Sequence, residues 1–444
     1  MPTSALTDWV VRRGAELHKV TVGRDAFGGR ALCAAEDIAE GETVLRIPLP
    51  ALLTVDLARR SPSGQALLAA SREPPGAAAL LTAYLLSERR APSSSIAPYL
   101  ACLPRSFPTV PLFCAPEVLP HLRGTLAAGL LVKRREAVMR EVLELKRAVP
   151  TLRDATLPEL FWASTAVITR VFGITVRGSA TEALVPFADM MNHRRPPELL
   201  WTYDEDGAAF TVRAARAVTA GEEVCGSYGR KANHRYFIHY GFAMTSGADD
   251  EAAVRLSVPA GMPRASTKAQ ALRRAYGQED LHSMSSRVRA DVTQRTLSFL
   301  RTASATNGEI GRALRALSNG DLVPPLSHRN EATALSLLHT ACVESLARFD
   351  SPEEADDEHA LESPDLTPQV RHAILVRRGE KRLLHAWRRV ADTAIPMLLG
   401  PRRAFFHAAV HHRGEGLTMS YLTDVAMALA PRDARRPPDP DAGP

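Results

Sequence analysis

Three short segments that combine polar side chains with glycine or aromatic residues follow one another closely in this 444-residue chain. They are residues 186–193 (PFADMMNH), 221–229 (GEEVCGSYG) and 233–242 (NHRYFIHYGF). Each places side chains that can bind or react, such as Asn, His, Glu and Tyr, next to apolar residues. One such segment alone would indicate little, but three in this order and spacing narrow the folds that the chain can adopt.

The composition is that of an ordinary globular protein of two or three domains. Hydrophobic residues make up 45% of the chain, which is enough for a sizeable core. The net charge of +6 comes largely from scattered arginines, and it permits an acidic partner without requiring nucleic acid. Because aromatic residues make up only 6% and no basic stripe is interleaved with them, we expect no nucleic-acid partner. We also expect a monomer.

Cysteine usage and hydropathy indicate a reducing compartment and no membrane partner. The five cysteines include no closely spaced pair, which argues against a disulfide framework and against a cysteine-rich zinc site. They are Cys33, Cys102, Cys114, Cys225 and Cys342. The longest apolar run, at residues 76–86, is too short to cross a bilayer, and the N-terminus lacks a signal-peptide pattern. We expect a cytoplasmic or nuclear location, with an organelle not excluded.

Strand and helix patterns alternate along the first half of the chain. Short alternating runs within residues 17–53 predict strands. Strand patterns return over residues 184–228, where residues 204–207 predict a hairpin turn. The stretch between them reads as helical, and Thr156 and Pro158 indicate the start of one helix. The clearest helices there are predicted at Ala77–Arg90, Leu126–Ala148 and Leu157–Arg170.

The chain after residue 248 reads as helical. The strongest helical patterns lie at residues 331–347 and 367–394, while the acidic stretch 353–362 indicates a solvated loop or helix start. The tail at residues 431–444 is rich in Pro, Asp and Arg and is predicted to be disordered. The predicted fold class is therefore α+β, with a β-rich domain split by a helical insertion and followed by an all-α C-terminal domain.

The three segments resemble those of the SET-domain protein methyltransferases, in particular the Rubisco large-subunit methyltransferase-like family. The likeness extends to a glycine turn at residues 28–30 and to the segment around residues 373–384. It implies a SET domain at residues 10–245 with a helical insertion at about 55–160. It also implies a helical substrate-binding domain at residues 250–430. The implied methyl donor is S-adenosylmethionine (SAM), and no metal is expected.

The resemblance assigns the cofactor-binding residues position by position. The family's helix arginine meets the carboxylate of SAM, and a planar guanidinium suits a carboxylate because it donates two parallel hydrogen bonds. The family's Asn-His pair lines the adenine pocket, and the aspartate before it braces the loop. The positions so implied are Gly28, Gly29, Arg30, Arg170, Asp189, Asn192, His193 and Tyr228.

The resemblance also assigns the reaction. Tyr228 matches the catalytic tyrosine, and Phe172 and Tyr240 match residues that wall the channel for the substrate amine. The expected activity is N-methylation of a lysine in a non-histone protein. A member of the family that methylates histidine has polar residues after the helix arginine and lacks a tyrosine at the position of Tyr240. Histidine methylation and a catalytically silent binding module remain the alternatives.

The same residues admit other interpretations. Arg170 could cap a helix dipole, and Tyr228 could be a packing residue. The 189–193 segment could bind a metal if His234, His239 or Glu223 supplied further ligands. Three positions depart from the family pattern, and they could alter SAM affinity or weaken the strand before Tyr228. They are Gly28, Ala31 and Gly226.

Overall fold

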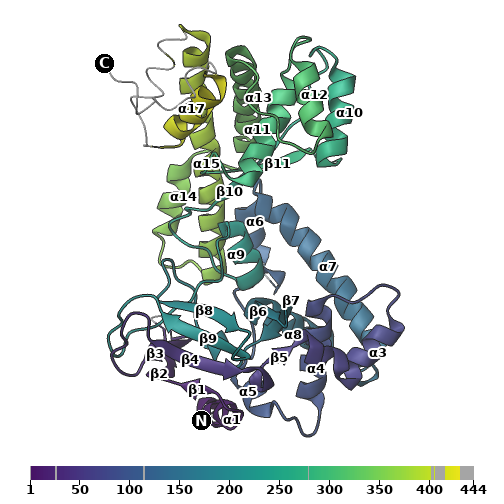
Figure 1. The fold of residues 1–444 in the computed structure, drawn as a ribbon, viewed down its shortest axis with the longest axis vertical. Helices are drawn as coiled ribbons and strands as arrows, with labels where there is room; N and C mark the ends of the chain where they lie inside the picture. Colours follow the sequence, from purple (N-terminus) through teal and green to yellow (C-terminus); the bar gives the residue numbers. More distant parts are fainter. Residues whose placement is uncertain are drawn as a thin grey trace, which may run out of the picture. The chain divides into compact units, whose positions relative to one another are not determined.

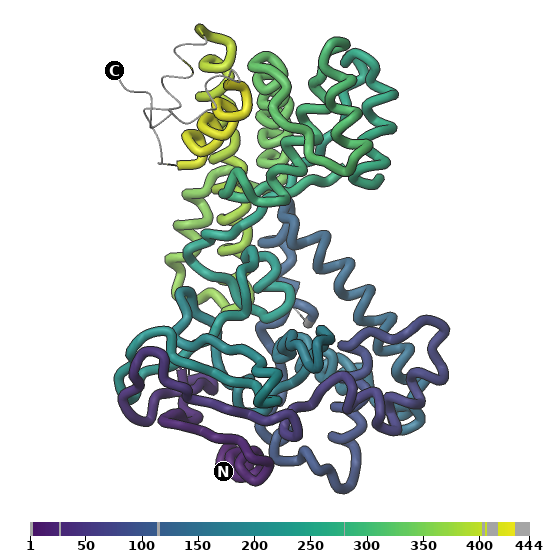
Figure 2. The backbone as a smooth tube through the Cα atoms, in the orientation of Figure 1, coloured from purple at the N-terminus to yellow at the C-terminus, as the bar shows by residue number. Residues whose placement is uncertain are grey.

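The computed structural model describes residues 2–25, 28–113, 116–278, 280–401, 405 and 416–430. The chain forms two compact units (Figure 1, Figure 2). The first unit consists of Met1–Pro108 and Val132–Arg230, and the second consists of Thr109–Leu131 and Lys231–Pro444. The tail at residues 431–444, predicted to be disordered, lies outside the described residues. The domain bounds predicted from the sequence stay a prediction.

The first unit combines small antiparallel sheets with helices inserted between their strands (Figure 1). Its strands are β1 (Glu16–Leu17), β2 (Val20–Arg24), β3 (Arg30–Ala34), β4 (Thr43–Pro48), β5 (Leu53–Thr54), β6 (Val171–Val176), β7 (Ser179–Leu184), β8 (Leu199–Asp204) and β9 (Ala209–Ala214). Its helices are α1 (Pro2–Val11), α2 (Val55–Arg60), α3 (Pro62–Ala70), α4 (Ala77–Arg90), α5 (Ala97–Cys102) and α8 (Leu157–Arg170). Helix α7 (Leu126–Ala148) begins in the second unit and ends in the first.

The strands pair as three sheets with the orders β1-β4-β9-β8, β5-β7-β6 and β2-β3. Strands β8 and β9 form an antiparallel hairpin, which confirms the turn predicted at residues 204–207. Ile47 on β4 and Phe210 and Val212 on β9 are fully buried, so the largest sheet supplies much of the local core. Burying such side chains is the main favourable contribution to folding.

Three helices of the first half of the chain form where the sequence predicted them. Helices α4, α7 and α8 have the predicted bounds. At the start of α8 the Thr156 hydroxyl accepts the Glu159 N–H, and the Glu159 carboxylate accepts the Thr156 N–H. This capping box satisfies two backbone donors that a helix start otherwise leaves free. It fixes the start of the helix whose last residue is Arg170.

The second unit is helical and contains one two-stranded sheet. Its elements are α6 (Leu119–Leu122), α9 (Asn233–Tyr240), β10 (Glu251–Arg255), α10 (Ala265–Tyr276), β11 (Leu281–Ser285), α11 (Asp291–Ala303), α12 (Ile310–Ser318), α13 (His328–Leu346), α14 (Glu354–Leu361), α15 (Pro368–Leu399) and α17 (Gly416–Leu429). Helix α15 packs against α13 and α17, and Trp387 is buried in their shared core. Within the described residues, no helix has both the length and the apolar character needed to span a bilayer.

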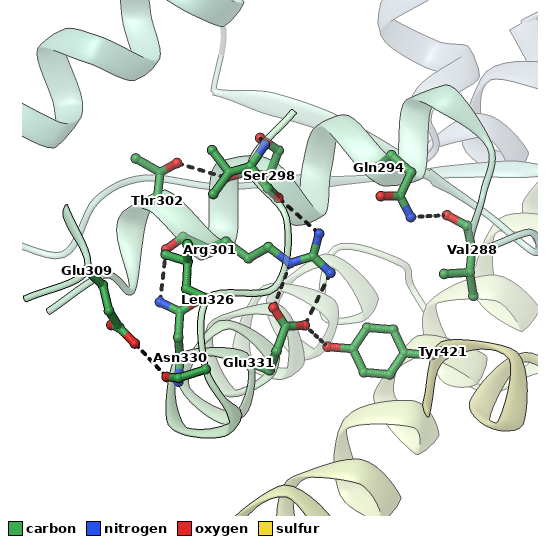
Figure 3. A network of polar contacts seen from close by, with 12 residues as sticks. Val288, Gln294, Ser298, Arg301, Thr302, Glu309, Leu326, Asn330, Glu331 and Tyr421 are labelled. Atoms are coloured by element: carbon green, nitrogen blue, oxygen red, sulfur yellow. Dashed lines mark hydrogen bonds and ion pairs between the residues drawn. The ribbon is translucent and has the colours of Figure 1, made fainter. Parts of the chain in front are cut away.

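A buried ion pair joins three helices of the second unit (Figure 3). Arg301 on α11 donates from Nε to Glu331 Oε1 on α13 at 2.6 Å, and from Nη2 to Oε2 at 3.3 Å. Tyr421 on α17 donates its hydroxyl to Glu331 Oε2 at 2.5 Å. The two ionic side chains are only 5% and 0% exposed. Burial and the Glu331 carboxylate together raise the pKa of Tyr421 well above its usual value.

The predicted α+β fold class is confirmed, and the structure adds detail in the C-terminal half. Strands β10 and β11 pair there, although their sequences contain few of the β-branched and aromatic residues that favour strands. The acidic stretch forms α14 rather than a loop. Its Asp357 is fully buried and pairs with Arg377 and Lys381 on α15, so it anchors the helix.

Candidate functional site

The turn between β2 and β3 is held by an aspartate that the sequence analysis did not single out. Asp25 Oδ1 accepts the backbone N–H of Gly29 at 2.7 Å. A Cβ atom on Gly29 would lie 2.5 Å from Asp25 Oδ2, so a larger residue would push this carboxylate away from the turn. Gly28 has φ +80, a conformation that glycine adopts at no steric cost. The backbone conformation at position 28 therefore favours glycine, and the residue at position 29 affects where the Asp25 carboxylate lies.

Residues 222–226, just before Tyr228, form backbone hydrogen bonds with a different part of the chain on each side, and we call this arrangement the clasp. On one side Val224 N donates to Leu32 O of β3 at 2.9 Å. On the other side Gly226 N donates to Asn192 O at 2.9 Å, and Gly226 O accepts from Arg194 N at 3.1 Å. Residues 222–226 thus lie between the glycine-turn hairpin and the loop that follows residue 191.

Gly226 does not leave this segment unpaired, because both of its backbone polar groups are hydrogen bonded. A Cβ atom at this position would make only ordinary contacts with Met191, the nearest at 3.6 Å. Glycine is therefore not demanded by space here. The departure from the family pattern at this position removes a side chain but no ladder hydrogen bond.

The Asn192 side chain connects the glycine turn to the clasp. Asn192 Nδ2 donates to Glu223 Oε1 at 2.8 Å, and it lies 3.4 Å from both Asp25 Oδ2 and the Arg30 carbonyl oxygen. This amide therefore links the glycine turn to the clasped segment. Glu223, weighed above as a metal ligand, serves here as its hydrogen-bond acceptor.

Tyr228 is fixed by both its backbone and its hydroxyl. Its N–H donates to His193 Nδ1 at 3.0 Å, so this nitrogen is the acceptor of the imidazole and the ring proton resides on Nε2. The two rings stack with centroids 5.2 Å apart. The Tyr228 hydroxyl donates to Met191 O at 2.9 Å. Because that contact uses its single hydrogen, the oxygen presents only lone pairs to any further partner.

Arg170 ends α8 in an ion pair with Asp189. Its Nη1 donates to the Asp189 carbonyl oxygen at 2.8 Å and to Oδ2 at 3.2 Å. The hydroxyl of Tyr99, on α5 of the insertion, donates to the same Oδ2 at 2.8 Å. Burial raises the pKa of Asp189, although the Arg170 charge and the Tyr99 hydrogen bond oppose that shift. Burial and Asp189 also raise the pKa of Tyr99 well above its usual value.

Several polar atoms of this ion pair are not used by the described residues. Arg170 Nε and Asp189 Oδ1 are buried and have no hydrogen-bond partner there. The Arg170 side chain is 17% exposed. Buried polar groups are normally satisfied, so these two atoms mark an unusual environment. Of the two side chains only Arg170 is partly exposed, and its guanidinium suits a carboxylate.

The two predicted channel residues lie in different units. Phe172 on β6 packs edge-on against Phe210 and Trp201, with ring centroids 5.0 and 5.3 Å apart. Tyr240 on α9 lies beside Tyr236 and Phe242 in the second unit, and burial raises its pKa. The shared channel of these two residues stays a prediction.

The alternative interpretation of a metal centre requires several ligand side chains close together. Among the residues that the structure describes, no group of three His, Cys, Asp or Glu side chains is placed to hold an ion. His234 and His239 belong to α9 in the second unit. Burial lowers the pKa of His234 to about 3, so this imidazole is neutral at physiological pH.

Two family models match the chain. The SET domain matches residues 29–229, and the Rubisco LSMT substrate-binding domain matches residues 260–384. The SET match begins at Gly29, so it leaves out Asp25 and Gly28. It contains the other candidate residues of the first unit.

The similar curated proteins are named for histidine methylation, whereas one similar solved structure contains monomethyllysine. The chain is 29% identical to the actin-histidine N-methyltransferase of Danio rerio and 27% identical to that of Homo sapiens. These matches cover 86% and 85% of this chain but only 66% of each relative, so the chain spans just under two thirds of their length. Rubisco LSMT bound to AdoMet matches with a TM-score of 0.71 at 20% identity over 94% of this chain and 97% of that one. Rubisco LSMT bound to sinefungin and monomethyllysine matches with a TM-score of 0.70 at 19% identity, over 93% and 97% of the two chains. At this identity, the structural likeness shows the fold.

Proposed function

Because the chain combines a SET domain with a Rubisco LSMT substrate-binding domain, we propose that it is a SAM-dependent protein-lysine N-methyltransferase acting on a non-histone protein. The observation that carries this proposal is the clasp of residues 222–226, which brings Tyr228 against His193. A tyrosine held at both its backbone and its hydroxyl is suited to aligning a reaction rather than to filling a core.

The polar groups of the first unit fit SAM. The Arg170 guanidinium suits the carboxylate of the methionine part, and Asp189 would brace the loop and hold Arg170 in place. The glycine turn at Gly28, Gly29 and Arg30 would lie along the methionine part, and Asn192 and His193 would hold the adenosine part. When bound, SAM supplies a methyl group on a positively charged sulfur. The solved SET structures named above, one of them bound to AdoMet, support this choice of methyl donor.

The chain's own residues would act mainly by positioning. Methyl transfer is a one-step displacement, so catalysis depends on alignment and on exclusion of water. A free lysine has a pKa near 10.4, and burial beside a cation lowers it, which makes the amine neutral and nucleophilic. The Tyr228 oxygen presents only lone pairs, because its hydrogen is given to Met191 O. It would therefore accept an amine N–H and direct the nitrogen lone pair at the methyl group.

Lysine is preferred over histidine because of the apolar surroundings of Phe172. An imidazole that attacks with one nitrogen needs a hydrogen-bond partner for the other. Phe172 packs edge-on against the stacked rings of Trp201 and Phe210 and offers none. The second candidate is histidine methylation, and the likeness to actin-histidine N-methyltransferases favours it.

The experiment that tests the proposal incubates the protein with isotope-labelled SAM and an extract of hypomethylated proteins. Acid hydrolysis and amino-acid analysis then separate methyllysine from methylhistidine. Label in methyllysine that disappears with Tyr228→Phe supports the proposal. Label in methylhistidine would replace it with the second candidate. No label, with SAM binding also absent, would leave a catalytically silent binding module.

A further inference from the structure

Helix α5 contacts the candidate SAM site at two points. The Tyr99 hydroxyl donates to Asp189 Oδ2 at 2.8 Å. At the end of the helix, the Cys102 carbonyl oxygen accepts a hydrogen bond from Arg30 Nη1, at the glycine turn. The helical insertion therefore contacts the site through α5, and both partners are residues that the resemblance assigns to SAM binding.

Tyr99 is placed to fix a carboxylate rather than to fill space. Its side chain is fully buried, and its hydroxyl is the second donor on Asp189 Oδ2, beside Arg170 Nη1. Two hydrogen bonds to one oxygen restrict rotation of the Asp189 carboxylate about its side-chain bond. Arg170 Nη1 also donates to the Asp189 backbone carbonyl oxygen, so the orientation of the guanidinium depends on the position of Asp189.

Helix α5 is itself held by the N-terminal helix. Trp9 on α1 donates from Nε1 to the Ser95 carbonyl oxygen at 2.7 Å, just before α5 begins. Leu6 and Val10 on α1 are fully buried, and α1 packs against α5. The position of α5, and with it that of Tyr99, is thus held by packing against α1.

We propose that Tyr99 is a positioning residue for the methyl donor, and that it acts through Asp189 to hold Arg170 in the plane that binds the donor's carboxylate. This inference rests on the proposed function. It assigns part of the cofactor affinity to a residue of the helical insertion, which does not itself contact the donor. A merely structural tyrosine would affect all ligands of the site alike, whereas a residue acting through Arg170 affects only ligands with a carboxylate.

The test compares two ligands of different chemistry. S-adenosylhomocysteine contains the amino-acid part, and 5′-methylthioadenosine contains the adenosine and sulfur but no carboxylate. Calorimetry measures both for the wild type, for Tyr99→Phe and for Tyr84→Phe. Tyr84 lies on α4 in the same insertion and is also buried, so it is a matched control for loss of a hydroxyl. Circular dichroism confirms that each variant is folded, and phenylalanine retains the volume of the tyrosine ring.

We expect Tyr99→Phe to raise the Kd of S-adenosylhomocysteine about tenfold, which corresponds to about 1.4 kcal/mol. Binding of 5′-methylthioadenosine should not change, and Tyr84→Phe should change neither. Equal losses for the two ligands, or no loss for either, would overturn the role of Tyr99 while leaving the proposed function intact. A wild-type protein that binds neither ligand would overturn both.

Discussion

Removing the charge of Glu331 should strongly destabilise the second unit. This carboxylate accepts two hydrogen bonds from Arg301 and one from Tyr421, and it is fully buried. In Glu331→Gln the amide oxygen can accept from only one side, and the new NH2 group faces a donor. The Arg301 guanidinium then stays buried without a counter-charge. Breaking a buried pair in this way costs about 3–5 kcal/mol, and we expect about 3 kcal/mol here because glutamine retains one acceptor.

Hydrogen exchange read by mass spectrometry gives the free energy of opening for α13 and α17 without assuming that both units unfold together. Tyr421→Phe removes one hydrogen bond to a charged group and should cost less than Glu331→Gln, about 1.5–3 kcal/mol. The control is Asp280→Asn in the surface pair with Arg255, whose side chains are 55% and 53% exposed. Exposed pairs contribute about 0–1 kcal/mol. A loss below 1 kcal/mol for Glu331→Gln would refute the argument that this pair is desolvated.

Three further predictions concern two residues of the candidate site and one buried carboxyl group of the second unit. Gly29→Ala should displace Asp25 and weaken SAM binding by calorimetry; unchanged affinity would show that the turn can adjust. Tyr228→Phe should bind SAM but lose most turnover, and normal turnover in a labelled-methyl assay would remove its assigned role. Burial raises the pKa of Glu380 to about 8, above its usual 4.5, so the folded state binds an extra proton between these values. Stability from this group is therefore fully present below about pH 4.5 and is lost as the pH rises to about 8. Glu380→Gln, which can still accept the Leu126 N–H, should flatten the decline in thermal stability between about pH 5 and 8; an equally steep decline would assign it to another group.

Local signals predicted local structure well. Thr156 and Pro158 predicted the start of α8 because capping involves only neighbouring residues. The order of the polar segments indicated Asn192, His193 and Tyr228, which the structure brings into one hydrogen-bonded group.

Long-range partners could not be predicted in the same way. Tyr99 meets Asp189 across 90 residues, and nothing near Tyr99 in the sequence marks its hydroxyl as special. Asp25 was missed because an aspartate before a glycine turn is common in any loop. Strands β10 and β11 form because packing on the core of the second unit overrides weak local propensity.

The clasp around residues 222–226 has a consequence for how the chain becomes functional. The segments on its two sides lie far apart in the sequence, and the contact between Asn192 and Asp25 joins residues 167 positions apart. Contacts so distant in sequence form late and slowly, since the intervening loop must first be closed. A nascent or truncated chain that lacks residues 222–228 contains the glycine turn and the Asn-His pair but not the segment that joins them. If the first unit binds SAM as proposed, we expect that affinity to be acquired only after residues 222–228 have been synthesised and have joined the glycine turn to the Asn-His pair.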